Sequence, residues 1–262
     1  MSAAGERILW PAEPIWEAVA PLLPGFSVEI LPEIDSTNSE LMRRARAGRF
    51  EPVLLVAERQ TAGRGRLGRN WLSGVQGATS LTFSLGLAVA PADWSGLSLA
   101  VGVTLAESLH PSVQLKWPND LWVSGRKLAG ILIETASFGE GSAARRYAVI
   151  GVGINLAPPA APGLAVAPMG LQELLPAAQA GAVLLRLAGP LVQAVQAFET
   201  YGFAPFQARF NARDVLRDRA VVLSDGTAGT AHGASEAGAL LVHTSSGMKT
   251  VTSSEVSVRP AA

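Results

Sequence analysis

The sequence predicts an α+β fold, in which a domain of several strands and helices is followed by a small C-terminal β-barrel. Apolar runs of strand length occur together with amphipathic runs of helix length, but in no strict alternation. The last stretch of about 50 residues contains only short β-like runs, with turn signals roughly ten residues apart. With 48% hydrophobic and 16% charged residues, the 262-residue chain can also bury a substantial core.

The chain is expected to begin with a short helix over residues 14–22, followed by a strand with β-branched side chains over residues 28–34. The run Asp35–Gly48 predicts a second helix. Thr37 and Glu40 fit a capping box at its start, and a glycine follows its last turn.

Two strands are expected next, because residues 52–60 begin with a continuous apolar run and residues 80–89 alternate. Residues 94–110 have helical spacing and end beside a proline, which predicts a helix. Residues 113–117 predict a strand that stops at a proline. Residues 120–134 predict a hairpin over a tight Ser-Gly turn.

A further strand is expected over residues 147–156, followed by a loop rich in Pro, Ala and Gly over residues 157–170. Helical spacing returns over residues 179–200 and 203–212. The composition then changes to the short β-like runs of the barrel. We therefore expect two domains, residues 1–212 and residues 213–262.

Composition narrows the class of protein. Lys and Arg together number 21, as do Asp and Glu, so the formal net charge is zero. This balance argues against DNA, bulk RNA or an anionic membrane as a partner held by overall charge. The lack of Cys excludes disulfides and thiolate metal sites. Pro and Gly interrupt the longest uncharged run, residues 147–172, and no signal-peptide pattern is present, so we expect a cytoplasmic protein.

An arginine- and glycine-rich loop, "QTAGRGRLGRNW" (residues 60–71), follows one of the expected strands. It lacks the Gly-Lys-Ser/Thr of a Walker A loop. Its glycines permit positive φ and close backbone approach, and its arginines offer planar forks that suit phosphate or carboxylate. They are Gly63, Gly65 and Gly68, and Arg64, Arg66 and Arg69. Two interpretations stay open: a loop that orders over an anionic ligand, and an arginine-rich surface or RNA-binding loop.

Other polar residues stand at the ends of expected strands. In "KWPND", Asn119 can bond a base or ribose and Asp120 can hold a hydrated Mg²⁺, although the same letters also make an ordinary turn. Lys127, one of only three lysines, begins an apolar strand, and Asn155 ends another. The two glycines of "GVGIN" indicate either close approach of another group or strand packing alone.

Taken in order, "IDSTN", "ERQTAGRGRLGRNW", "KWPNDLWV", "KLAGILIE" and "GVGINL" closely resemble the biotin–protein ligase family. The resemblance runs from about residue 30 to residue 156, and "EVSVR" near the C-terminal end also matches. The resemblance implies a catalytic domain like that of class II synthetases, with a mixed β-sheet flanked by helices, and a C-terminal β-barrel of SH3 type. The segment before residue 30 is too short for a helix-turn-helix domain, so we expect the monofunctional form, which does not bind DNA.

The resemblance also implies which residues contact biotin. Ser36, Thr37 and Asn38 resemble contacts to the biotin head group, and Gln60 resembles the partner of its ureido group. The remaining members of the biotin set resemble the groups around the biotin carboxylate and the α-phosphate, and they are Arg64, Gly65, Arg66 and Lys127. Arg66 and Lys127 are expected to be catalytic.

For ATP, the resemblance points to six residues: Arg64, Arg69, Trp71, Asn119, Asn155 and Arg259. Trp71 resembles the aromatic that covers adenine, and Arg259 resembles a barrel residue that reaches toward the nucleotide. Asp120 is the expected Mg²⁺ ligand. The chain departs from the family after Trp71, where it reads "SGVQGATSLTF" and Ser80 stands where Asn is common.

The implied reaction is the ATP-dependent activation of biotin to biotinyl-5′-AMP, followed by transfer to a lysine of a biotin carboxyl carrier protein. Two anions must approach each other in the first step, which explains a loop of arginines with a lysine opposite. Within the superfamily, lipoate or octanoate transfer is the alternative, but its arginine-serine-glycine-glycine-glycine pattern is not found. A nucleotide- or RNA-binding module that uses the arginine loop is the alternative from another class. A homodimer through sheet edges is implied by resemblance only.

Overall fold

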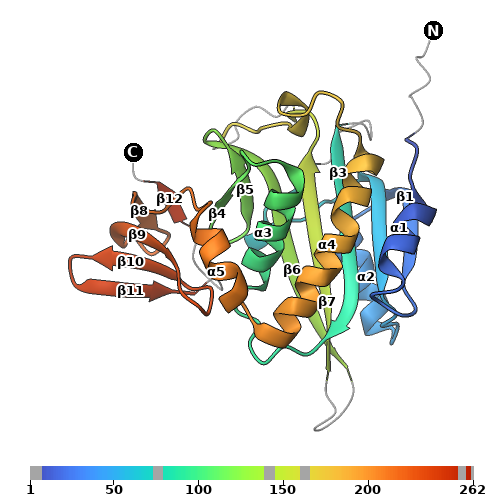
Figure 1. The fold of residues 1–262 in the computed structure, drawn as a ribbon, viewed down its shortest axis with the longest axis horizontal. Coiled ribbons are helices and arrows are strands. Elements are labelled where there is room, and N and C mark those ends of the chain that lie inside the picture. Colours follow the sequence, from blue (N-terminus) through green and yellow to red (C-terminus); the bar gives the residue numbers. More distant parts are fainter. Residues whose placement is uncertain (1–7, 73–78, 139–144, 160–165, 253–257, 261–262) are drawn as a thin grey trace. The chain divides into compact units, whose positions relative to one another are not determined.

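The chain forms two compact units in this computed structural model: Met1–Ala90 with Arg126–Val192, and Pro91–Gly125 with Gln193–Ala262. The structure describes every residue except 1–7, 73–78, 139–144, 160–165, 253–257 and 261–262 (Figure 1), and for Arg145 and residues 258–260 it describes the backbone alone. The second unit takes in a segment well before residue 213. The division into residues 1–212 and 213–262 therefore stays a prediction.

A mixed sheet organises the first unit, as predicted. The strands that the first unit contributes follow the order β1 (Ser27–Ile34), β2 (Val53–Gln60), β3 (Ser80–Val89), β7 (Arg145–Asn155) and β6 (Arg126–Phe138). β1 and β2 run parallel, and every other neighbouring pair runs antiparallel. The continuous apolar run in β2 and the alternating run in β3 both become strands buried along most of their length.

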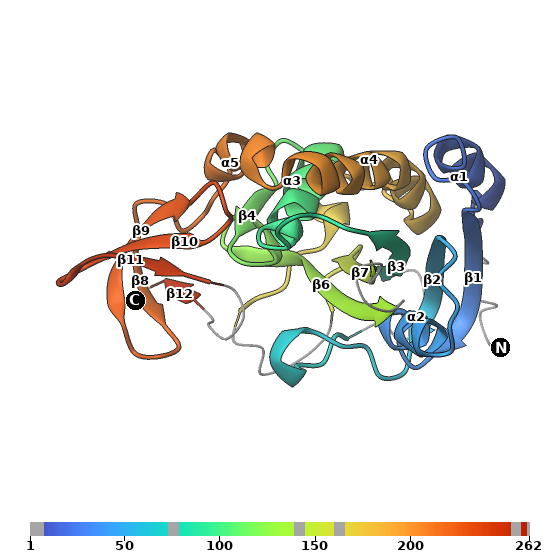
Figure 2. The ribbon, with the colours of Figure 1, turned by 90° about the horizontal axis from the view of Figure 1, so that it is seen from below.

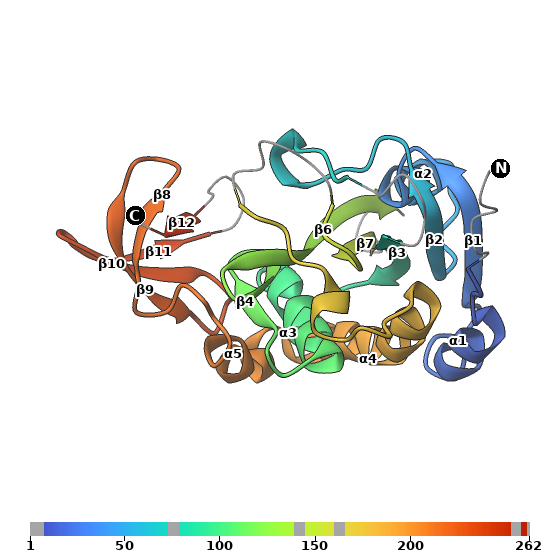
Figure 3. The same cartoon turned by 90° about the horizontal axis from the view of Figure 1, so that it is seen from above.

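Helices cover both faces of this sheet. Figures 2 and 3 show α2 (Thr37–Arg46) on one face, and α1 (Ala12–Val19) with the first half of α4 (Ala180–Tyr201) on the other. By length and composition, α4 is apolar enough to cross a membrane, because its most apolar stretch has a mean hydropathy of 1.3. However, 61% of that stretch is buried inside the fold, as expected of a core helix.

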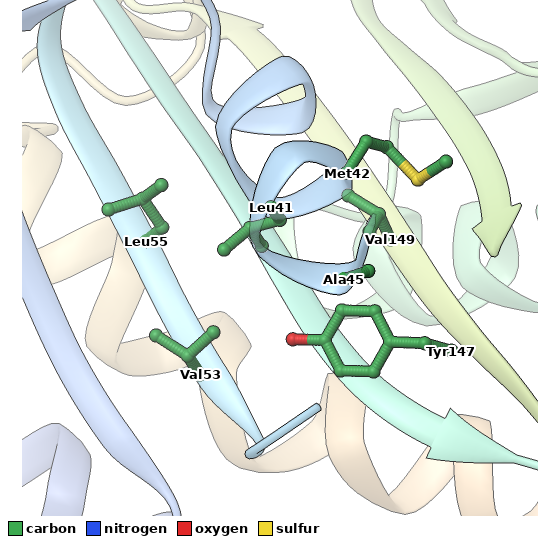
Figure 4. Close-up of a cluster of buried hydrophobic side chains, with 7 residues drawn as sticks. All are labelled: Leu41, Met42, Ala45, Val53, Leu55, Tyr147 and Val149. Carbon is green, nitrogen blue, oxygen red and sulfur yellow. The ribbon is translucent and has the colours of Figure 1, made fainter. Parts of the chain in front are cut away.

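A compact apolar cluster holds α2 on the sheet (Figure 4). Three of its side chains come from α2 and the others from β2 and β7, and they are Leu41, Met42, Ala45, Val53, Leu55, Tyr147 and Val149. The Tyr147 hydroxyl donates to the carbonyl of Glu51 at 3.1 Å. A Cβ at Gly86 would lie only 2.2 Å from that hydroxyl, so glycine there makes room for the tyrosine. This packing fixes where the N-terminal end of α2 lies.

The second unit begins with α3 (Leu97–Leu109) and a short antiparallel hairpin, β4 (Gln114–Lys116) and β5 (Asp120–Val123). It continues through the end of α4 and α5 (Ala204–Asn211). Its C-terminal part is an antiparallel sheet in the order β11 (Gly247–Val251), β10 (Leu240–Thr244), β9 (Ala228–Ala234), β8 (Ala220–Leu223) and β12 (Val258–Pro260). The predicted turns there have glycines at positive φ, at Gly226, Gly238 and Gly247.

Candidate functional site

The N-terminal end of α2 contributes three buried polar residues. Ser36 is the N-cap, with an extended backbone and a side-chain oxygen that accepts from the Ser39 N–H at 3.4 Å. The prediction that Thr37 caps this helix was therefore wrong by one position. Thr37 is instead the first helical residue, and it is as buried as Ser36 and Asn38. Its hydroxyl is available to other partners because the cap comes from its neighbour.

A neutral hydrogen-bond network joins these residues to β2 and β3. The Gln60 Oε1 accepts from the Thr37 N–H at 2.7 Å and lies 3.1 Å from the Thr37 hydroxyl. The Ser84 hydroxyl lies 2.7 Å from the Thr37 hydroxyl and 2.6 Å from the Asn38 Oδ1. Because Asn38 Oδ1 carries no hydrogen, Ser84 donates there. The structure thus brings Thr37, Asn38 and Gln60 together, and it adds Ser84, which sequence reasoning missed.

Both glycines of "GVGIN" mark the close approach of a site residue. A Cβ at Gly151 would lie 2.1 Å from Asn38 Oδ1, and one at Gly153 would lie 2.3 Å from the Trp71 indole. The two positions are two residues apart in β7 and so share one face of the sheet. Of the two interpretations left open by the sequence, the close approach of another group is the one observed.

Trp71 and Lys127 both lie close to Gly130 of the neighbouring strand. A Cβ at Gly130, in β6, would lie 3.3 Å from Lys127 Nζ and 3.6 Å from the Trp71 ring. The Trp71 Nε1–H is buried and finds no hydrogen-bond partner among the described residues. The indole, the ammonium and the polar end of α2 therefore lie along one face of β6 and β7.

The arginine loop forms a small hairpin of its own. The Trp71 N–H donates to the carbonyl of Gly63 at 2.9 Å, and the Gly65 N–H donates to the carbonyl of Arg69 at 2.7 Å. At its tip is a 3-10 turn, Arg66–Gly68, in which Gly68 has a φ of 70°. Gly63 allows close approach, since a Cβ there would meet the Trp71 carbonyl at 2.5 Å. Gly65 does neither, because its φ is −123° and a Cβ would have ordinary space.

Arg64 pairs with a carboxylate of its own chain. Its guanidinium donates to Glu134 at 3.0 and 3.3 Å, and to the Ser39 hydroxyl at 3.4 Å. The Arg64 side chain is 48% exposed, and such ion pairs contribute only about 0–1 kcal/mol. A ligand carboxylate or phosphate can therefore replace this partner at little cost. Glu134 also accepts from the Asn38 Nδ2 at 3.1 Å, which links the loop to α2.

Ala167 and Met169, in the loop that follows β7 and has no sequence motif, hold the backbone of Lys127; this segment is called the strap below. The Lys127 N–H donates to Ala167, and its carbonyl accepts from the Met169 N–H at 2.8 Å and from the Asn155 Nδ2 at 3.3 Å. Asn155, expected at the nucleotide, thus has its amide on the lysine strand. Sequence reasoning had no signal for the strap, because its contribution to Lys127 is made by backbone groups.

An ion pair between Arg126 and Glu173 connects the strap to β6. Glu173 accepts from Arg126 at 2.7 and 3.2 Å and from the Gly170 N–H at 2.9 Å. The hydrogen bond from Arg126, followed by that from Gly170, lowers the pKa of the Glu173 carboxyl. Glu173 ends the 3-10 turn Leu171–Glu173, so the strap is tied to the residue next to Lys127.

Three expected site residues belong to the second unit. Asn119 and Asp120 lie where β4 turns into β5, and Asp120 pairs with Lys116 across the hairpin. Arg259 pairs with Val222 through β12, and its side chain is not described. Among the described residues, no group of three His, Asp or Glu side chains is preformed for a metal. Residues 73–78, where the chain departs from the family pattern, lie outside the described residues.

The chain is similar to known biotin protein ligases. Residues 32–155 match the biotin/lipoate A/B protein ligase family, and residues 220–259 match the biotin protein ligase C-terminal domain. The bifunctional ligase/repressor BirA of Escherichia coli is 37% identical over 253 residues, which cover 91% of this chain and 76% of that protein. The chain belongs to the biotin protein ligase family.

Two more relatives are similar to this chain over nearly their whole length. The biotin–[acetyl-CoA-carboxylase] ligase of Paracoccus denitrificans is 34% identical to this ligase over 241 residues, covering 87% of this chain and 98% of that one. The solved structure of the Aquifex aeolicus biotin protein ligase, in complex with biotin and ATP, has a TM-score of 0.74 and 29% identity. It covers 89% of this ligase and 99% of that chain. The predicted fold class, a mixed sheet with flanking helices and a C-terminal SH3-like domain, is confirmed.

Proposed function

We propose that this ligase activates biotin with ATP to biotinyl-5′-AMP, through the residues that gather on one face of β6 and β7. The observation that carries the proposal is the division of this face into a neutral end and a cationic end. Thr37, Asn38 and Gln60 present uncharged donors and acceptors, which suit a ureido group. Arg64 and Lys127 present positive charge, which suits a carboxylate beside a phosphate.

In the first step, a carboxylate oxygen of biotin bonds to the α-phosphorus of ATP, and pyrophosphate leaves with the electrons of the broken bond. Lys127 and Arg66 neutralise the two anions as they approach and stabilise the charge of the transition state. In the second step, the ε-amine of an acceptor lysine bonds to the acyl carbon and loses a proton, and AMP leaves. Arg66 and the turn that contains it cover the mixed anhydride and exclude water.

For the nucleotide, we assign Trp71, Arg69, Asn119, Asn155 and Arg259 as contacts. The buried Nε1–H of Trp71 finds no partner among the described residues, which supports a ligand acceptor at the edge of the indole, because burial of a donor without a partner is costly. Asp120 fits Mg²⁺ that arrives with ATP, since this ion takes one or two carboxylates and fills its other positions with water and phosphate oxygens. When bound, the ion neutralises the leaving pyrophosphate.

The acceptor partner of the family is a biotin carboxyl carrier protein, and we assign the same class of acceptor here. A cytoplasmic location, a homodimer and the lack of DNA binding stay predictions.

The lack of DNA binding is tested by a gel shift with operator-like DNA, with and without biotinyl-5′-AMP. A shift that needs the adenylate and survives 200 mM salt, a condition that weakens purely phosphate-driven binding, contradicts that prediction.

The experiment for the function is an exchange of labelled pyrophosphate into ATP, run with biotin, lipoate or octanoate. We expect exchange with biotin alone, and biotinyl transfer when a carrier domain is added. Exchange driven by lipoate or octanoate favours the alternative within the superfamily. Recovery of RNA and no biotin species from the denatured protein favours the binding module.

A further inference from the structure

A buried hydrogen bond joins the C-terminal β-sheet to the loop that carries Asn119 and Asp120. Trp117 is 1% exposed, and its Nε1–H donates to the carbonyl of Gly238 at 3.2 Å. The two residues are 121 positions apart, and both belong to the second unit. Gly238 lies in the turn between β9 and β10. No step described above uses this contact.

The turn is anchored on the side of β9. Its Gly238 N–H donates to the carbonyl of Ser235 at 2.9 Å. Ala234, just before the turn, donates to the Asn211 Oδ1 at 2.8 Å and accepts from the Gln207 Nε2 at 2.9 Å. Both of these partners come from α5, so the backbone that leads into the turn is held at two points.

Close packing then fixes Gly238 itself. Its φ is +77°, and a Cβ there would lie 2.6 Å from the Cα of Gly96, at the start of α3. Gly96 also has a positive φ, and a Cβ on it would lie 2.7 Å from Phe203. Two backbones therefore meet at van der Waals distance, which only glycine permits. The carbonyl that Trp117 uses is held in place by the surrounding backbone.

On the other side of the bond, Trp117 begins a very short connection. Only Trp117, Pro118 and Asn119 join β4 to β5, and Lys116 pairs with Asp120 across the hairpin. A fixed Trp117 leaves few backbone angles between the anchor and the two polar residues. The loop is thus held by the strand pair at its base and by the indole hydrogen bond at its first residue.

We propose that Trp117 and Gly238 are positioning residues, through which the C-terminal sheet sets the "KWPND" loop for the nucleotide. The inference rests on the proposed function, specifically on Asn119 and Asp120 as nucleotide and Mg²⁺ contacts. Neither Trp117 nor Gly238 touches the ligand in this assignment. Their effect comes through the placement of the loop, and displacements of about 1 Å at such contacts are costly.

The test removes the hydrogen-bond donor and keeps the ring. Benzothienylalanine at position 117 replaces the indole N–H by sulfur with almost the same shape, and Trp117→Phe is the simpler variant. We expect the KM for ATP in pyrophosphate exchange to rise by roughly three- to tenfold, the range that one buried hydrogen bond commonly supplies. The Kd for biotin, measured without ATP, should stay the same.

Trp122 gives a matched control on the same hairpin. Its Nε1 is also buried, but it has no hydrogen-bond partner among the described residues. Benzothienylalanine at position 122 changes the same atom without breaking a hydrogen bond, and it keeps the ring whose centroid lies 5.0 Å from Lys116 Nζ, so the KM for ATP should not change. A lower Tm with an unchanged KM for ATP at position 117 overturns the proposal and leaves a purely structural contact. An equal rise at both positions overturns it too. Failure of the proposed function is distinct, because the wild-type enzyme then shows no biotin-dependent exchange.

Discussion

Single side chains of the first unit fall into two groups that do different work. Thr37 and Gln60 are neutral and bonded to each other, whereas Arg64 is charged and paired with Glu134. The ammonium of Lys127 lies close to Gly130, as the Trp71 ring does, and the backbone of Lys127 is held by three hydrogen bonds. Because the backbone of Lys127 is fixed, only its side-chain torsions can vary. Its positive charge is therefore held near the site before the substrates bind.

The first residue-scale prediction compares two of the three lysines. Lys127→Ala should slow biotinyl-AMP formation by at least about a hundredfold, the scale of losing one preorganised charge. Lys249→Ala should leave this step nearly unchanged, because Lys249 bonds Asp225 and Thr227 at 2.8 and 2.9 Å on the β-sheet of the second unit. Pyrophosphate release measured on both variants decides it, and equal effects would rule out the assignment of Lys127.

The second residue-scale prediction concerns the tip of the arginine loop. Arg66→Gly removes a guanidinium from the turn that ends at Gly68, and it loosens the backbone there. The adenylate should still form, because Arg64, Arg69 and Lys127 remain. It should dissociate roughly ten- to a thousandfold faster, since a charge-assisted contact and loop order are lost together.

Stopped-flow release of biotinyl-AMP measures this directly, and a lysine-rich bystander protein blotted for biotin reports its escape. Bystander labelling should rise, whereas labelling of the enzyme should stay modest because the chain has only three lysines. Release at the wild-type rate would mean that this turn is not the cover of the intermediate.

At the scale of elements, β7 determines where other parts of the chain can lie. Its glycines form a flat track on one face, and Asn38 of α2 and Trp71 of the loop sit directly on it. α2 is held above this track by its apolar cluster and by ion pairs from Arg43 and Arg44 to neighbouring carboxylates. β7 therefore positions Asn38 and Trp71, because Gly151 and Gly153 have no side chains that would displace them.

A pair of alanine substitutions on β7 should separate these two ends. Gly151→Ala drives a methyl group into Asn38, so the Kd for biotin should rise by at least about tenfold. Gly153→Ala displaces the Trp71 ring, so the KM for ATP should rise by a similar factor with a smaller change for biotin. Calorimetric titration of biotin and pyrophosphate exchange measure the two effects. Identical profiles for the two variants would show that β7 acts only through general stability.

For the whole molecule, Asp214 ties stability to pH. Desolvation by burial raises the pKa of its carboxyl from 3.8 to about 6, with Asp218 adding to the rise and Arg217 opposing it. Its Oδ2 has no hydrogen-bond partner among the described residues. The folded state therefore binds more protons than the unfolded state between about pH 4 and pH 6. The contribution of this residue to the free energy of unfolding falls as the pH rises through that window.

Asp214→Asn should remove this dependence while its side-chain oxygen still accepts from the Leu216 N–H. The difference in stability between variant and wild type should grow in favour of the variant from pH 4 to pH 7, by at most about 3 kcal/mol. Thermal unfolding across this range measures it, with Glu17→Gln, at an exposed carboxylate of α1, as the control. A difference that stays constant with pH would show that Asp214 does not titrate between the two states.

Much of the fold followed from patterns along the chain. Hydrophobic period and length predicted β2, β3 and α3 within a few residues, because one face or both faces of each must be buried. The prediction at the start of α2 failed because Ser36 and Thr37 both suit an N-cap. Burial decided between them, since the Thr37 hydroxyl meets Ser84, which is 47 residues away.

By itself, the sequence determined the chemistry: an arginine loop, a lone lysine at a strand start and neutral polar residues before a helix, in the order of a biotin protein ligase. The tertiary structure alone decided which partners these groups meet. Glu134 on Arg64, the strap on Lys127 and Gly238 on Trp117 are contacts between segments far apart along the chain. Local patterns carry no information about such pairs. They arise when packing brings the two segments together and each buried polar atom must find a partner.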